Sequence, residues 1–177
     1  TLHFWLRDDD ATHPSPALER LLRLCADHRV PPTLAVIPAR ASPDLAATLP
    51  APVRVARHGW AHENHAPASE KKQELGSHRP PSQVLAELAR GLTRLQDLFP
   101  DHLIDLLVPP WNRIAPGVIA GLPGIGIRAL SAFGKVTAGN LPVLNPQIDP
   151  IDWHRTRSLH DPVGLWQALA QAAVAGD

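Results

Sequence analysis

The sequence predicts an α/β fold with a parallel sheet, on the basis of two observations. Short apolar runs alternate along the chain with amphipathic segments, as strands and helices do in proteins of this class. Polar residues follow directly after several of these runs, which is where α/β proteins place their functional sites. With 177 residues, 44% of them hydrophobic, the chain can bury the core of one domain. A single domain built as a β/α barrel or an open α/β sheet is therefore expected.

The first half of the chain is expected to contain three strands and two helices. Residues 2–6 are apolar and aromatic, and they end at three consecutive aspartates, as a strand that leads into a polar loop would. An amphipathic run over 17–28 predicts a helix, and 33–37 reads as the second strand. Ser42 is expected to cap a short helix, and 53–56 form the third strand.

The second half begins after His58 with a long polar stretch through Pro81, which is expected to lie at the surface. A helix follows over 82–98, because its apolar residues recur every three or four positions. The remaining expected elements are strands over 103–108, 127–131 and 142–144, and helices over 115–121 and 163–175.

The overall composition excludes partners that are recognised mainly by charge. Lys plus Arg and Asp plus Glu each number 17, so no basic surface for nucleic acid is expected. No transmembrane segment is expected either, because no run of about 18 apolar residues exists. Cys25 lies in an apolar helical pattern and is expected to pack in the core. Because the chain starts at Thr1 and lacks methionine, a truncated amino terminus is expected, which leaves a signal peptide, the compartment and the oligomeric state open.

Asp8, Asp9 and Asp10 form the first candidate site. Three adjacent carboxylates at a strand end repel one another and lose solvation if they turn inward. Capping or turn duties explain one such residue readily. A bound cation explains three more economically, so the metal interpretation is favoured and the capping interpretation stays open.

His58 and His62 form the second candidate site. Their spacing of four places both imidazoles on one face of a helical turn, from which both can reach one ion. The alternative is a solvated His-rich loop that also includes His65 and His78. With one aspartate, the pair supplies two nitrogens and one oxygen and leaves a position open for water, as catalytic zinc sites require.

The order of these motifs resembles the polysaccharide deacetylase family, whose members remove acetyl groups from N-acetylated sugars on a distorted β/α barrel. The family's first motif is a strand that ends in Asp-Asp, so the resemblance implies that Asp9 is the general base and Asp10 a metal ligand. Asp8 and Asp9 are the alternative pair. The second motif, His-x-x-x-His, corresponds to His58 and His62 as the other two ligands of one divalent ion, with Zn²⁺ expected.

Two further motifs match in part. The third is normally an Arg followed by Pro-Pro and an aromatic residue. Here Val108 takes the place of the Arg, Trp111 is the aromatic residue, and Arg113 is the alternative cation. The fourth is an acidic and aromatic wall beside the family's pocket, represented by Asp152 and Trp153. The resemblance implies that these four residues, Trp111, Arg113, Asp152 and Trp153, contact the substrate.

The fifth motif, an apolar strand that ends in a general-acid His, is not found. His160 is the alternative acid, and the last strand of the barrel is expected beyond residue 177. The resemblance implies a metal-dependent hydrolase that deacetylates N-acetylated sugars or polysaccharides. Two alternatives stay open, a carbohydrate-binding protein without turnover that uses the aromatic faces of Trp60, Trp111 and Trp153, and a metal-dependent amidase acting on another substrate.

Overall fold

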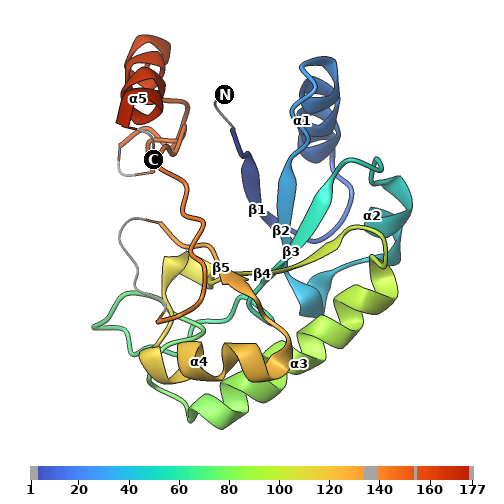
Figure 1. Cartoon of the computed structure of the whole chain (residues 1–177), viewed down its shortest axis with the longest axis vertical. Helices are drawn as coiled ribbons and strands as arrows, with labels where there is room; N and C mark the ends of the chain where they lie inside the picture. Colours follow the sequence, from blue (N-terminus) through green and yellow to red (C-terminus); the bar gives the residue numbers. More distant parts are fainter. Residues whose placement is uncertain (1–3, 134–138, 154, 176–177) are drawn as a thin grey trace.

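The computed structural model describes residues 4–133, 139–153 and 155–175, and it contains one sheet of five parallel strands (Figure 1). The strands lie side by side in chain order and are β1 (Arg7–Ala11), β2 (Thr33–Val36), β3 (Arg54–His58), β4 (Leu103–Val108) and β5 (Ala129–Leu130). The helices are α1 (Pro16–Asp27), α2 (Pro43–Thr48), α3 (Pro81–Leu98), α4 (Pro116–Gly121) and α5 (Pro162–Ala175). Short 3-10 turns are η1 (Pro38–Arg40), η2 (Pro110–Asn112) and η3 (Leu122–Ile125).

The helices begin where the sequence provides caps. Ser15 and Ser42 accept hydrogen bonds from the third amide that follows each of them, at 3.2 Å in both cases. Proline stands in the first turn of α1 to α4, where its missing N–H removes no helical hydrogen bond. The predicted cap at Ser42 is confirmed, and the predicted bounds of α3 and β4 agree with the structure to within one residue.

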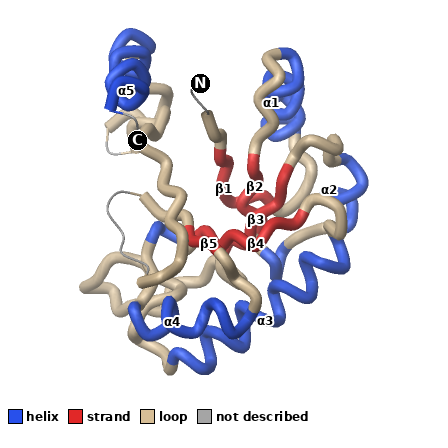
Figure 2. Tube along the Cα trace, in the orientation of Figure 1, coloured by secondary structure: helices blue, strands red, loops and turns tan. Residues whose placement is uncertain are grey.

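Two layers of apolar side chains cover the two faces of the sheet. Figure 2 shows α1 to α4 along the outer side of the curved row of strands. The outer layer includes Leu34, Val55, Leu95 and Phe99 in one cluster and Leu88, Leu107 and Leu122 in another. The inner face carries the small cluster Ala35, Ala56, Leu106 and Val108, against which Trp5 packs. Cys25 of α1 is buried, as predicted.

The sheet curls until its two edges approach each other on the inner side. Arg7 of β1 donates from Nη1 to Ser131 Oγ at 2.7 Å, and Ser131 directly follows β5. Within the described residues β1 and β5 share no ladder, so the sheet is open between them. The predicted α/β fold with a parallel sheet is confirmed, whereas the closed barrel stays a prediction.

Three predicted strands differ from the structure. The prediction of a strand over 2–6 is wrong for residues 4–6, because the strand starts at Arg7 and contains the aspartates; residues 2 and 3 lie outside the described residues. The ladder decides this placement, since Arg7 is in register with Thr33. β5 has two residues instead of the predicted five, and residues 142–144 contribute only a bridge from Val143 to Leu130.

The last helix, α5, lies away from the other helices (Figure 1). Its residues are mostly apolar, and Trp166 is 71% exposed. In the part of the chain that the structure describes, no helix combines the length and the apolar content that a membrane crossing needs.

Candidate metal centre

The curled sheet brings the ends of β1 and β3 together at the carboxyl edge of the strands. Asp10 is the fourth residue of β1, and its positive φ of 70° turns the backbone at the end of the strand. His58 is the last residue of β3. The ends of parallel strands lie on the same edge of a sheet, so residues that are 48 positions apart in sequence meet there.

Asp10, His58 and His62 present three ligand atoms to one point. Asp10 Oδ1 lies 3.2 Å from His58 Nε2 and 3.2 Å from His62 Nε2, and the ligand atoms of the three residues all lie within 4.8 Å of one another. Atoms about 2.0–2.1 Å from a tetrahedral zinc ion lie about 3.3 Å from one another. The spacing and the chemistry of these donors therefore fit a small divalent ion.

The tautomer of His58 supports a cation at this point. His58 Nδ1 lies 2.9 Å from the carbonyl oxygen of Val108, which can only accept, so Nδ1 carries the proton. In the neutral imidazole, the lone pair of Nε2 then faces the Asp10 carboxylate. Two acceptors repel unless a proton or a metal ion lies between them. The same Nδ1–H to carbonyl contact is the usual way in which proteins orient a metal-binding histidine.

The pKa values at the centre shift in directions that favour binding. When His58 Nε2 also carries a proton, its hydrogen bond to Asp10 holds the pKa of that carboxyl below its usual value, against the opposing effect of burial. Burial lowers the pKa of His62, which favours its neutral form. An ionised carboxylate and a neutral imidazole are the forms that bind a metal ion.

The loop between the two histidines is not the helical turn that the spacing predicts. Gly59 and His62 have φ angles of 60° and 57°, so the chain turns back sharply after β3. Glu74, in the following polar stretch, accepts hydrogen bonds from the amides of Trp60, Ala61 and His62. The prediction that the whole stretch 59–81 lies at the surface is therefore wrong, because Glu74 is only 1% exposed.

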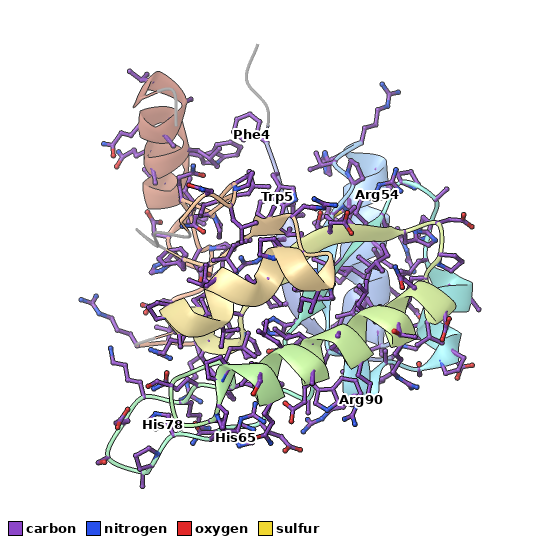
Figure 3. The ribbon with its side chains drawn as sticks, turned by 60° about the horizontal axis from the view of Figure 1, so that its bottom comes forward. Phe4, Trp5, Arg54, His65, His78 and Arg90 are labelled. Carbon is purple, nitrogen blue, oxygen red and sulfur yellow. The ribbon has the colours of Figure 1, made fainter. Side chains whose placement is uncertain are left out.

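Trp111 packs against the triad, whereas the other histidines of the same stretch have other surroundings. The ring of Trp111 lies 4.2 Å from that of His62, centroid to centroid, at an angle of 46°. His65 and His78 lie in the outer part of the polar loop (Figure 3), where His78 contacts Glu70. The loop therefore contains both a converging pair of histidines and solvated ones.

Asp9 is held by Arg7, a residue to which none of the sequence motifs assigns a function. Arg7 Nε lies 2.8 Å from Asp9 Oδ1, and Nη2 donates to Oδ2 at 3.0 Å. The first contact is an ion pair without hydrogen-bond geometry, since Oδ1 makes no hydrogen bond among the described residues. The available signal is the i, i+2 spacing, which places both side chains on one face of a strand.

Asp8 has a different environment from Asp9 and Asp10. Its carboxylate interacts electrostatically with Cys25 of α1, and burial raises its pKa to about 6, with Asp9 and Asp10 adding to the rise. A cavity of about 400 Å³ between β1 and α1 is lined by all three aspartates. Asp10, and not Asp8, belongs to the triad with metal-ligand spacing. This favours Asp9 and Asp10 over Asp8 and Asp9 as the functional pair.

No family model matches the sequence, and no curated protein matches it. Solved structures do match. The deacetylase PplD from Streptococcus pyogenes, solved with acetate, superposes with a TM-score of 0.63 at 16% identity, over 94% of this chain and 68% of its own. A family 4 acetyl xylan esterase from Clostridium thermocellum, solved with a cobalt ion, superposes with a TM-score of 0.53 at 16% identity, over 97% of this chain and 84% of its own.

A third match is a protein from Mycobacterium smegmatis assigned as a polysaccharide deacetylase, with a TM-score of 0.62 and 16% identity. The match covers 89% of this chain but spans only 58% of the Mycobacterium protein. The chain has a polysaccharide deacetylase-like fold. At these identities the likeness to the deacetylases concerns the fold, and the chemistry rests on the residues of this chain.

The remaining residues that were predicted to contact the substrate or to act as the acid do not belong to the triad. Arg113 donates from Nη1 to the carbonyl oxygen of Lys72, so Arg7 and not Arg113 pairs with Asp9. Trp153 Nε1 donates to Asp149 Oδ2, Asp152 Oδ1 accepts from the Arg155 amide, and the His160 amide donates to the Pro150 carbonyl. Substrate contact by these residues, and the acid role of His160, stay predictions.

Proposed function

We propose that this protein is a metal-dependent hydrolase that removes acetyl groups from N-acetylated sugars. The observation that carries the proposal is the position of the Asp9 carboxylate, ion-paired with Arg7 and adjacent in sequence to a three-residue cluster with metal-ligand spacing. The fold supports it, because the matched proteins include a deacetylase solved with acetate and an esterase solved with cobalt.

Asp10, His58 and His62 would hold the ion, and Zn²⁺ suits their two nitrogens and one oxygen. When bound, the ion supplies a Lewis acid for the acetamide carbonyl and lowers the pKa of a water molecule. Asp9 would act as the general base and accept a proton from the attacking water molecule. Arg7 keeps the Asp9 carboxylate in one orientation through the ion pair.

A cavity adjoins the aspartates on the side of α1, and His58, His62 and Trp111 do not line it. Its volume of about 400 Å³ lies within the range of small-molecule sites, and Asp9 and Asp10 both line it. Trp111, packed on His62, adds an aromatic face next to the centre, and such faces stack on sugar rings. Arg113, Asp152 and Trp153 are proposed as more distant substrate contacts.

The test is to measure metal content and deacetylation in the same preparations. Purified protein is expected to hold about one divalent ion per chain and to release acetate from N-acetylated oligosaccharides, with loss of activity after chelation and recovery with Zn²⁺. His62→Ala should lose the ion and the activity. His65→Ala, a change of the same type in the same loop, should keep both.

Each other outcome points to a different function. Metal binding with hydrolysis of simple amides but not of acetylated sugars would favour the amidase. Sugar binding without metal and without acetate release would favour the carbohydrate-binding protein. A wild-type chain that binds neither metal nor sugar would overturn the proposal.

A further inference from the structure

Glu74 is a buried carboxylate to which the proposed chemistry assigns no step. It lies between β3 and α3, is 1% exposed, and forms no salt bridge among the residues that the structure describes. Burying an acidic group without a cation is costly, so its environment must compensate in another way.

Three consecutive backbone amides provide this compensation. Glu74 Oε1 accepts from the amides of Ala61 at 2.7 Å and His62 at 3.1 Å, and Oε2 accepts from the Trp60 amide at 3.2 Å. All three amides belong to the loop between the ligands His58 and His62. Successive amides that converge on one anion form a concave anion-binding site in the backbone, and here the anion is a side chain of the same protein.

The conformation of the loop depends on this contact. His62 is a non-glycine residue with a positive φ, which costs about 1 kcal/mol unless surrounding contacts stabilise it. The Glu74 carboxylate also occupies the space where a side chain at position 59 would begin, because a Cβ built on Gly59 overlaps Glu74 Oε2. Glycine at 59 and glutamate at 74 therefore fit each other.

Glu74 is itself attached to the helical layer. Its carbonyl oxygen accepts from Arg79 Nη2 at 3.1 Å, and Arg79 Nη1 donates to both carboxylate oxygens of Glu87 on α3 at 2.9 Å. The carbonyl oxygen of the next residue, Leu75, accepts a hydrogen bond from the Ala115 amide at 2.8 Å. The Glu74 carboxylate thus holds the loop of the histidines, while its own backbone and that of Leu75 are fixed to α3 and to the segment before α4.

We propose that Glu74 is a positioning residue that holds the loop 58–62 in the conformation in which His62 Nε2 reaches Asp10 Oδ1. The proposal rests on the proposed metal-binding function. Without this contact, His62 would have to be ordered when the ion binds, and that ordering would weaken the affinity. Metal affinity therefore depends on a residue that does not contact the ion.

The test compares Glu74→Gln with Glu70→Gln, an exposed glutamate in the same stretch. In Glu74→Gln, one oxygen still accepts from the amides of Ala61 and His62, but the new NH₂ group faces the Trp60 N–H, and two donors repel. We expect Zn²⁺ to bind about 10-fold to 100-fold more weakly in competition with a chelator dye, and the visible spectrum of the Co²⁺-loaded protein to change. Glu70→Gln should match the wild type in both.

Thermal unfolding in EDTA shows whether the variant is folded, and Glu74→Asp, which keeps the charge on a shorter side chain, should bind Zn²⁺ better than Glu74→Gln. If Glu74→Gln does not fold, equal affinity of wild type and Glu74→Asp overturns the proposal, and weaker binding by Glu74→Asp supports it. A folded Glu74→Gln with wild-type affinity and spectrum overturns it as well. A wild-type protein that binds no metal would instead refute the proposed function on which the inference rests.

Discussion

Arg7 and Asp9 lie on one face of β1 and form a close ion pair, with Arg7 Nε 2.8 Å from Asp9 Oδ1. The Arg7 side chain is only 7% exposed, and its guanidinium also reaches Ser131 after β5 and Asn112 in the loop after β4. One side chain therefore ties the first strand to the far edge of the sheet and fixes the carboxylate proposed as the general base. The family that the sequence resembles has an arginine in its third motif, where this chain has Val108.

Arg7→Met should lower kcat by about 10-fold to 100-fold while the metal stays bound, because Asp9 keeps its charge but loses the group that orients it. Arg54→Met is the matched control on β3, since Arg54 is exposed and bonds to backbone carbonyls away from the centre. Steady-state kinetics and metal analysis measure both effects. Equal losses in the two variants would show that Arg7 has no specific effect on Asp9.

Asp9→Asn should keep the metal and lose most of the turnover, by about 100-fold or more, because the amide still accepts from Arg7 but cannot take a proton from water. Single-turnover acetate release on Zn²⁺-loaded protein separates this loss from weaker substrate binding. Unchanged activity with unchanged metal content would transfer the role of base to Asp8 or remove it.

Gly59→Ala should destabilise the protein by about 2 kcal/mol or more and weaken metal binding. The new Cβ would overlap Glu74 Oε2 and lie 2.7 Å from Pro110 Cγ, and the φ of 60° disfavours alanine. Gly124→Ala is the control, because nothing lies within 4 Å of a Cβ there. Urea unfolding in EDTA measures the stability of both variants, and similar values would contradict the steric argument.

Asp8→Asn should stabilise the metal-free protein at neutral pH. Burial raises the pKa of Asp8 from 3.8 to about 6, so the folded state holds a proton that the unfolded state releases. The free energy of unfolding of the wild type therefore falls as the pH rises from about 4 to about 6. With a discount for partial exposure, we expect the variant to be more stable by about 1–2 kcal/mol above pH 7 and equally stable near pH 4. Urea unfolding in EDTA tests this, and a gain independent of pH would contradict it.

Arg57→Met should also stabilise the protein, by about 1–3 kcal/mol. The Arg57 side chain is completely buried, its three nitrogens have no hydrogen-bond partner among the described residues, and the oxygen of Asp105 lies 3.9 Å away. Burial lowers the pKa of Arg57 to about 10, which reflects the cost of the buried charge. Arg54→Met, three residues earlier, should change stability little. A loss of stability in Arg57→Met would mean that water or another group satisfies the guanidinium.

Local patterns in the sequence predict most helices and strands. The apolar period predicts a helix over 82–98, and α3 is Pro81–Leu98; the apolar run 103–108 is β4 itself. These elements follow from their own residues, because helix periodicity, prolines and serine caps act over a few positions. β1 does not follow in this way. Three adjacent carboxylates are poor strand formers, and only pairing with β2 places Asp8 to Asp10 inside a strand.

The sequence by itself singles out Asp9, Asp10, His58 and His62, because their types and spacing are those of metal and acid-base chemistry. Only the tertiary structure shows that the loop after His58 is not helical and that Arg7 pairs with Asp9. The same holds for Glu74, which stands in a polar stretch yet is buried against three backbone amides. The physical reason is range: capping and periodicity act within a few residues, whereas these contacts depend on how far the sheet curls and on which segments its curl brings together.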